Sequence, residues 1–512
     1  MPSPWFGVAP ARSLDSSSRY ENVWRAKRRG AQDVHVHLDI KVTGGVVRSA
    51  TEGDLSVFRG IPYAARPGRF GAPQPVQDWD GVREATRFGS PPPRSGALGM
   101  DALAEDGDDW LTVNVWSPDL GGELPVMVWI QGGAYMFGTS GLPEYDGSNL
   151  ARGGVLVVTF NYRVGLEGFG YVEGMPVNRG LLDQVAALEW VQHNISAFGG
   201  DPGRVTVFGQ SAGGGCVAAL LAMPRAVGLF RRAIAQSVPG AYFTPELAAD
   251  ITAACAAELG LQPAELSMVD PRLLPAASDA VMAKMEQFAG RWGRAAHGRI
   301  LFAPVIDGDL LPTTPWQGLS GRVELMVGHT RDEQRLLTAL SGMLGQITEA
   351  QATEAATIFG PDPQRYRDAF PDPQELYEVV RSDWLFRMPS LHLAEAQLRA
   401  GGPAHLYELT WPAPGMGGAL GTCHGLDVPL VFGNLTAGQP AMLIGDPTPE
   451  AAAVSDQMRT AWTAFAMNGD PGWPACDTGA TRLFDIEPVV AAHPELLSRR
   501  IWQEHPSVLT LG

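Results

Sequence analysis

The sequence predicts an α/β fold in which a mostly parallel central sheet is buried between helices. Apolar segments of strand length alternate with segments of helical periodicity between residues 113 and 210. Strands that are apolar on both sides belong in a sheet that is covered on both faces. The composition agrees with this prediction, because 45% of the 512 residues are hydrophobic and only 18% are charged. Such values exclude a disordered or fibrous chain.

The first elements along the chain form an arm and a hairpin. Residues 1–33 are rich in Pro, Ser and Arg and lack periodicity, so we expect an N-terminal arm that is poorly ordered or packs on the body. Strand-like segments separated by Gly-containing turns then predict an antiparallel hairpin leading into the sheet. These segments are His35–Val42, Gly45–Ser49 and Leu55–Ile61. The predicted division is therefore the arm at 1–33 and one α/β domain at 34–512.

The central part of the chain carries the most regular pattern. Apolar residues recur at three- and four-residue steps from Leu181 to Ile195 and stop before Gly199, which predicts an amphipathic helix. Beyond Pro224 the pattern favours helices, interrupted by two strands. The predicted strands of the sheet are Thr112–Trp116, Val126–Gln131, Val155–Tyr162, Val205–Phe208, Glu324–Gly328 and His405–Leu409.

Charge and apolar runs exclude several kinds of partner. Asp and Glu number 55 against 38 Lys and Arg, and the resulting negative field repels nucleic-acid phosphates. No apolar run approaches the roughly 20 residues that cross a bilayer, and no signal-peptide pattern is recognised at the N-terminus. The four cysteines lack C-x-x-C spacing, so we expect free thiols and no structural metal site. We expect no nucleic-acid partner, no membrane span, a cytoplasmic location, and a monomer or homodimer.

Ser211 stands at a strand-turn-helix junction. It lies in a Gly209-x-Ser211-x-Gly213 motif, after an apolar strand and before an Ala- and Gly-rich helix over Ala212–Ala222. Small residues two positions before and after the serine allow a sharp turn that lifts the hydroxyl clear of the sheet. The N-terminus of the helix then faces any negative charge that develops there. This context predicts a nucleophilic serine, and the alternative is a structural turn serine.

Several further segments carry a combination of motifs with that serine. They are Phe58–Tyr63, Asp109–Trp116, Val126–Tyr135, Asn161–Gly165, Gly180–Gln184 and Phe208–Gly214. Together they resemble the type-B carboxylesterase family, which also contains the cholinesterases and the bacterial para-nitrobenzyl esterases. The resemblance runs from about residue 35 to the end of the chain. It implies an α/β-hydrolase fold with helical insertions, hydrolysis of carboxylic esters without a cofactor or metal, and a Ser-Glu-His triad in that chain order.

The resemblance implies which carboxylate and which imidazole complete the triad. The acid falls in Gly328–Gln334, where Glu333 matches the family's glutamate. The segment follows a predicted strand, so it should open at the same edge of the sheet as Ser211. Asp332 is the competing carboxylate. Composition alone does not choose among ten histidines, but Cys423–Asn434 resembles the family's histidine loop. We expect His424 to be the base, with His329 as its rival.

The same resemblance implies an oxyanion hole. The segment Gln131–Gly138 follows a predicted strand and is similar to the family's oxyanion loop, with the main-chain N–H groups of Gly133, Ala134 and Ala212 as donors. The alternative is a plain Gly-rich turn. Gln131 departs from the usual esterase pattern, which has His there, and cholinesterases carry Tyr. We therefore expect this position to affect loop support and substrate choice more than catalysis.

Further side chains gain structural roles from the resemblance. We expect ion pairs between Arg59 and Asp108 and between Arg163 and Asp183, and a hydrogen bond from Ser237 near the triad. Trp110 stands where many relatives carry a disulfide cysteine, so that disulfide is expected to be absent.

The predicted activity is that of a serine carboxylesterase acting on small uncharged or apolar esters through an acyl-enzyme. Cationic esters of the acetylcholine type are an alternative, since 14 tryptophans offer faces for a cation. A biosynthetic acyltransferase or a lactone or carbamate hydrolase of the same fold is a second reading. A non-catalytic interaction protein is a third, which the presence of all three triad candidates disfavours.

Overall fold

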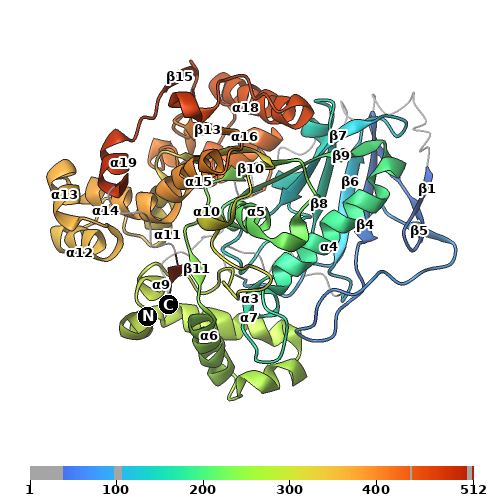
Figure 1. Ribbon diagram of the computed structural model, residues 1–512, viewed down its shortest axis with the longest axis horizontal. Helices are drawn as coiled ribbons and strands as arrows, with labels where there is room; N and C mark the ends of the chain where they lie inside the picture. Colours follow the sequence, from blue (N-terminus) through green and yellow to red (C-terminus); the bar gives the residue numbers. More distant parts are fainter. Residues whose placement is uncertain (1–37, 97–106, 439–440, 504–509, 512) are drawn as a thin grey trace, which may run out of the picture. The chain divides into compact units, whose positions relative to one another are not determined.

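The computed structural model describes residues 38–96, 107–438, 441–503 and 510–511 (Figure 1). The predicted arm at 1–33 lies outside the described residues, so the division of the chain at residue 34 stays a prediction. The predicted hairpin is present as β1 (Asp39–Val42) and β2 (Gly45–Arg48), which pair antiparallel. It joins β5 (Val82–Glu84) in a small separate sheet rather than leading into the main one.

Within the described residues, the main sheet has eleven strands. Pairing is parallel from β8 through β14 and antiparallel at both edges, which confirms the predicted mostly parallel sheet. In spatial order the strands are β15 (Val489–Ala492), β14 (Ala480–Phe484), β13 (Ala404–Leu409), β12 (Glu324–Thr330), β10 (Arg232–Gln236), β9 (Gly200–Gln210), β7 (Leu124–Ile130), β8 (Leu156–Phe160), β6 (Thr112–Ser117), β4 (Leu55–Pro62) and β3 (Ala50–Glu52).

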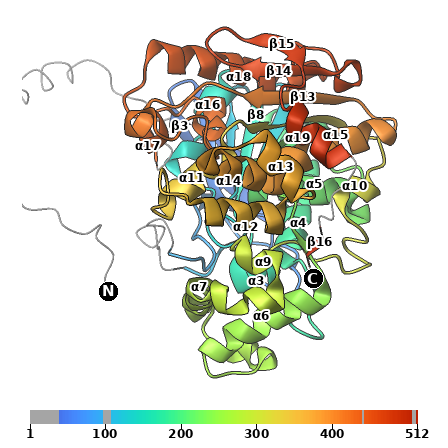
Figure 2. The ribbon, with the colours of Figure 1, turned by 90° about the vertical axis from the view of Figure 1, so that its left-hand side faces the viewer.

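Helices cover both faces of this sheet, as the apolar strands predict. In β7, Val126, Val128 and Ile130 belong to one hydrophobic core, while Met127 and Trp129 belong to the other. This division follows the two-residue alternation of side chains along a strand. The first core contains α4 (Arg179–Asn194), α5 (Ala212–Ala222) and α15 (Met388–Arg399). The second contains residues of α16 (Asp427–Phe432) and α18 (Pro449–Asn468), which are labelled in the upper part of Figures 1 and 2.

Further helices lie between the strands of the C-terminal half. They are α6 (Pro245–Glu258), α7 (Leu274–Ala283), α11 (Glu333–Leu340), α12 (Glu349–Phe359), α13 (Pro363–Ala369), α14 (Pro373–Ser382) and α19 (Leu496–Gln503). Four helices begin in the same way: Thr244, Asp362, Asp372 and Thr448 each precede a proline, and each side chain accepts a backbone N–H of the first turn. These residues satisfy donors that a helix cannot pair internally.

The strands β9 and β10 end level with one another near Ser211, and β12 continues slightly farther, to Thr330. In the register of the sheet, Gln210 of β9 lies beside Gln236 of β10, and Gln236 lies beside Gly328 of β12. All three strands are parallel, so the residues that follow them emerge at one edge of the sheet. Ser211, Ser237 and the segment leading to Glu333 therefore share that edge.

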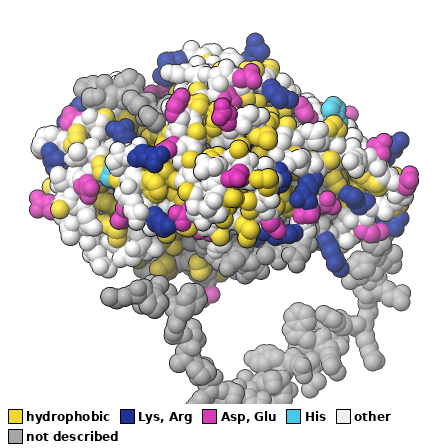
Figure 3. Space-filling view, turned by 90° about the horizontal axis from the view of Figure 1, so that it is seen from below, with side chains coloured by type: hydrophobic (Ala, Val, Ile, Leu, Met, Phe, Trp, Pro, Cys, Tyr) yellow, Lys and Arg dark blue, Asp and Glu magenta, His cyan; other side chains and the backbone are white. Residues whose placement is uncertain are grey.

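The surface shows no separation of charge on the face drawn in Figure 3. Basic side chains lie singly among acidic ones there, and apolar side chains are spread across the middle of the face. Among the described residues, no helix combines the length and the apolar character needed to cross a membrane.

Candidate active site

Ser211 occupies a strained turn between β9 and α5. Its φ of 58° and ψ of −127° lie in a region that non-glycine residues rarely adopt. The turn is held by two backbone hydrogen bonds: Ser211 donates to the carbonyl of Gln236 at 2.9 Å, and its own carbonyl accepts from Gly215 at 2.9 Å. The geometry is that of the nucleophile elbow predicted from the motif.

The glycines of the motif are required by close backbone packing. A Cβ atom on Gly213 would lie 2.0 Å from the carbonyl oxygen of Ile130, and one on Gly209 would lie 2.7 Å from that same oxygen. Any side chain at either position would push β7 away from the turn. The two glycines therefore let the serine turn sit directly against the strand that leads into the predicted oxyanion loop.

His424 lies between Ser211 and Glu333. Its Nε2 is 2.8 Å from Ser211 Oγ, and its Nδ1 is 2.5 Å from Glu333 Oε2. A carboxylate only accepts hydrogen bonds, so Nδ1 carries the proton and donates to Glu333. This leaves the Nε2 lone pair to accept from the Ser211 hydroxyl. The structure thus brings together the three side chains that the sequence singled out.

Glu333 is fixed by more than the histidine. It is fully buried at the start of α11, and its Oε1 accepts from the Ser237 hydroxyl at 2.6 Å and from the Thr330 N–H at 2.9 Å. The expected hydrogen bond from Ser237 near the triad is therefore present. Asp332 precedes α11 and instead accepts from the Thr422 N–H at 2.9 Å. That bond ties α11 to the loop that carries His424.

The structure does not bring His329 to Ser211. His329 is a buried residue of β12 whose Nδ1 lies 3.2 Å from the Thr330 carbonyl oxygen, and its Nε2 has no partner among the described residues. Burial lowers the pKa of His329 well below its usual value, and the nearby Arg387 adds to this effect. His329 is therefore a neutral buried residue in the pH range where histidine ordinarily titrates.

The segment after β7 passes directly over Ser211. A Cβ atom on Gly132 would lie 3.3 Å from Ser211 Cβ, and both Gly133 (φ 116°) and Ala134 (φ 51°) have left-handed backbone conformations. The loop's internal hydrogen bonds use the N–H groups of Met136 and Phe137. The N–H groups of Gly133 and Ala134 have no backbone acceptor among the described residues.

Ala212 adds a third N–H at this place. It is the first residue of α5, and the first N–H groups of a helix have no partner within it. The N–H groups of Gly133, Ala134 and Ala212 are thus available where the loop meets the N-terminus of α5. Ser211 lies between these two segments.

Three neighbours of the site were not predicted from the sequence. The Gln210 amide nitrogen lies 3.3 Å from His424 Nε2, and the Phe386 ring stacks on the His424 ring. Asp427 is fully buried and accepts from Gln236 Nε2 at 2.7 Å, and burial raises its pKa to about 6. Gln210 and Asp427 stand within quoted motifs, whereas no sequence pattern links residue 386 to residue 424.

The two predicted ion pairs have different outcomes. The side chains of Arg163 and Asp183 are both fully buried, and Arg163 Nη2 lies 2.7 Å from Asp183 Oδ1. This ion pair is therefore confirmed. The prediction of an ion pair between Arg59 and Asp108 was wrong. Arg59 of β4 pairs with Glu52 of the neighbouring strand β3, and Asp108 pairs with Arg66. The cysteines are free thiols, as predicted.

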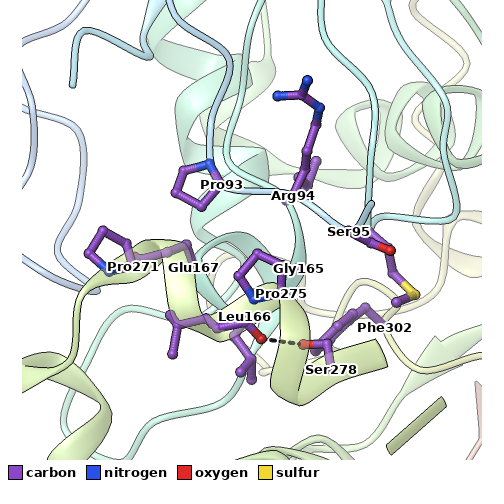
Figure 4. Close-up of a pocket in the computed structure, with 13 residues that line it drawn as sticks. Pro93, Arg94, Ser95, Gly165, Leu166, Glu167, Pro271, Pro275, Ser278 and Phe302 are labelled. Carbon is purple, nitrogen blue, oxygen red and sulfur yellow. Dashed lines mark hydrogen bonds between the residues drawn. The ribbon is translucent and has the colours of Figure 1, made fainter. Parts of the chain in front are cut away.

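A small pocket, drawn in Figure 4, is lined in part by Met136, which follows Ala134 in this loop. Its volume is about 10 Å³, which is room for about one water molecule. Met136, Leu166, Pro275 and Phe302 supply apolar walls, and Ser278 donates to the carbonyl of Leu274 at its rim. The pocket as it stands is too small to hold an acyl chain. Among the described residues, no group of three or more His, Cys, Asp or Glu side chains could hold a metal ion.

Comparison with known proteins gives one consistent result. A family model described as the carboxylesterase family matches residues 31–488. The para-nitrobenzyl esterase of Bacillus subtilis is 37% identical to this chain, over 91% of this chain and 98% of the relative. The phenmedipham hydrolase of Pseudarthrobacter oxydans is 34% identical, over 84% and 90% of the two chains.

Solved structures agree with these relatives. A PNB esterase superimposes with a TM-score of 0.81 at 35% identity, over 91% of this chain and 99% of the other. A carboxylesterase of Geobacillus stearothermophilus superimposes with a TM-score of 0.80 at 32% identity, over 91% and 100% of the two chains. The similarity therefore extends over almost the whole length of these proteins.

Proposed function

The chain belongs to the carboxylesterase family and is a carboxylic ester hydrolase with the α/β-hydrolase fold, and from this premise we propose that Ser211, His424 and Glu333 form its catalytic triad. The observation that carries the proposal is the continuous line of hydrogen bonds from Ser211 through His424 to Glu333. A serine hydroxyl is a weak nucleophile unless an adjacent base takes its proton. In this arrangement His424 is that base.

The reaction proceeds in two halves. Ser211 Oγ attacks the acyl carbon while His424 Nε2 takes the hydroxyl proton, and the imidazolium then returns that proton to the leaving alcohol. Water repeats the sequence on the acyl-enzyme and releases the acid. Glu333 holds the imidazole in the required tautomer and stabilises the imidazolium. Ser237 and the Thr330 N–H keep the Glu333 carboxylate in place.

The oxyanion of the tetrahedral intermediate is stabilised by the N–H groups of Gly133, Ala134 and Ala212. These groups are supplied by a loop in contact with Ser211 and by the N-terminus of α5. Donors that are fixed before the reaction need no rearrangement when the negative charge develops. The positive end of the α5 dipole acts in the same direction.

We propose small uncharged or apolar esters as the substrate class. Gln210 and Phe386, which contact the His424 ring and lie outside the proposed triad, are both uncharged. An uncharged or apolar alcohol group is compatible with both contacts. Neutral esters of para-nitrophenol with rising acyl length are therefore suitable first substrates.

The triad is tested by replacing Ser211. We expect Ser211→Ala to lose at least about 1000-fold in turnover of a para-nitrophenyl ester, because removal of the nucleophile leaves only the oxyanion hole and binding. An organophosphate should label the wild-type protein once and leave the variant unlabelled. Ser455→Ala is the matched control: its buried hydroxyl donates to the Leu430 carbonyl on α16, outside the proposed triad. Retention of more than a few per cent of turnover by pure, folded Ser211→Ala would refute the assignment.

A further inference from the structure

We propose that Phe386 is a positioning residue for the catalytic base. The ring of Phe386 stacks on the ring of His424, with centroids 4.3 Å apart and planes inclined by 28°. Phe386 is only 5% exposed, so this contact is shielded from water. The inference rests on the proposed role of His424 as the base, and it assigns a part in the reaction to a residue outside the triad.

The stack supplies a constraint that the hydrogen bonds of the triad do not. Glu333 holds Nδ1 and Ser211 holds Nε2, and hydrogen bonds tolerate a range of angles. Rotation about the Cα–Cβ and Cβ–Cγ bonds of His424 can therefore tilt the ring without breaking either contact. The Phe386 ring packed against one face limits this tilt, so the Nε2 lone pair stays directed at Ser211.

A local irregularity of the chain directs Phe386 toward the histidine. Residues Asp383–Arg387 form one turn of π-helix between α14 and α15, which we call the π-turn. The two helices that it joins are labelled in Figure 2. Such turns insert one residue into a helix and change the directions of the side chains around it, often at functional sites. Here Phe386 faces His424, whereas Trp384 of the same turn packs on Phe359 with ring centroids 4.5 Å apart.

The π-turn is anchored by contacts that do not involve His424. Asp383 is fully buried, accepts from the Tyr366 hydroxyl at 2.7 Å and lies 3.1 Å from the Arg387 guanidinium. Arg387 also pairs with Glu495. The carbonyl of Leu385 accepts from the Gly240 N–H at 2.8 Å. These contacts fix the backbone on both sides of Phe386, so its ring is held in place rather than drawn there by the histidine.

The stack also acts on the charged form of the base. The face of an aromatic ring is electron-rich and attracts a cation within about 6 Å. The imidazolium that forms in each half-reaction is thus stabilised by Phe386. The other groups that act on this ring are Glu333 at Nδ1, the buried Asp427, the uncharged Gln210 and Ser211 at Nε2, and the neighbouring Cys423 thiol.

The test compares aromatic and aliphatic side chains at position 386. We expect Phe386→Leu to lower kcat/KM by about tenfold, mainly through kcat, and equally for short and long acyl esters. The midpoint of the acidic limb of kcat/KM should move to lower pH by about half a unit, because the imidazolium loses a stabilising contact. Phe386→Tyr and Phe386→Trp should retain both the rate and the midpoint, or move the midpoint upward. Phe386→Met repeats the test if the leucine variant does not fold.

Phe359→Leu is the matched control. It removes a buried aromatic ring that packs on the same π-turn but does not stack on His424. We expect it to lower the melting temperature and to leave the pH profile unchanged. The inference is overturned if Phe386→Leu keeps wild-type kcat/KM and pH midpoint, if the aromatic variants lose as much as leucine, or if Phe359→Leu reproduces the shift. Substantial activity in His424→Ala would instead overturn the proposed function.

Discussion

Gln131 is the residue at which this chain departs most clearly from the usual esterase pattern. Its side chain is fully buried at the start of the proposed oxyanion loop, and neither its amide nitrogen nor its amide oxygen has a partner among the described residues. Its main-chain carbonyl accepts from the Tyr162 hydroxyl at 2.6 Å. The backbone of residue 131 is therefore fixed independently of its side chain, which fits a supporting role for the amide.

We predict that Gln131→His changes turnover of a small ester by less than roughly tenfold and alters the range of accepted esters more strongly. The proposed oxyanion donors are backbone N–H groups, and loss of a true donor costs on the order of 100- to 1000-fold. Turnover across a series of acyl lengths is the measurement. A uniform loss of 100-fold or more, with the circular dichroism spectrum preserved, would mean that the Gln131 amide acts on the transition state itself.

Local motifs explain which site residues could be predicted from the sequence. Ser211 lies in a turn whose glycines are needed for backbone contacts, and Glu333 and His424 lie in segments with a family pattern. Phe386 lies in the π-turn, which directs its ring toward His424. The two residues are 38 positions apart in the chain, and no motif or periodicity in the sequence connects them. Its position depends on the buried pairs around Asp383 and Arg387, which only the folded chain brings together.

The same limit applies to the elements of secondary structure. The long apolar strand β7 and the amphipathic helix α4 were predicted because their periodicity is sustained over many residues. β10 was missed, since only three apolar residues separate Arg232 from Gln236, and it gains its stability from β9 and β12 on either side. β14 and β15 at the edge carry exposed or polar positions, so they lack the apolar pattern of a buried strand.

The buried pair of Arg163 and Asp183 links two elements next to the proposed oxyanion loop. Arg163 precedes α3 (Gly165–Phe169), Asp183 lies in α4, and the intervening Gly165 donates to the Tyr135 carbonyl at 2.6 Å. Burial on its own lowers the pKa of Arg163, but the Asp183 carboxylate overcomes this effect and leaves the pKa raised. The Asp183 carboxylate therefore offsets the cost of burying the guanidinium charge.

We predict that Asp183→Asn lowers the free energy of unfolding by about 3 to 5 kcal/mol, because it leaves the Arg163 charge buried without its counterion. Denaturant unfolding followed by tryptophan fluorescence measures the change. Lys284→Ala, which breaks the more exposed pair with Glu258, should change stability by no more than about 1 kcal/mol. Equal effects of the two substitutions would contradict the argument.

At the scale of the whole molecule, ionisable groups buried outside the catalytic site make stability depend on pH. Burial raises the pKa of Glu408 to about 7, so the folded chain favours the protonated form of this carboxyl. Burial lowers the pKa of His493 to about 3, and the nearby Arg499 and Arg387 add to this effect. His493 is 3% exposed, and neither ring nitrogen has a partner among the described residues. As the pH falls, the protonation of Glu408 therefore favours the folded chain, whereas the low pKa of His493 disfavours it.

The contribution of His493 can be isolated by removing its imidazole. In the unfolded chain a histidine has a pKa of about 6.5, so between about pH 3 and pH 6.5 the unfolded state binds a proton that the folded state does not. This difference reduces stability as the pH falls below 6.5. We predict that the free energy of unfolding of His493→Phe, relative to wild type, rises by about 2 kcal/mol between pH 8 and pH 5. Glu408 and Asp427 titrate in both proteins and cancel in this difference. Denaturant unfolding of the two proteins at both pH values provides the measurement, and a relative stability that stays constant over this range would show that His493 is protonated as readily in the folded chain as in the unfolded one.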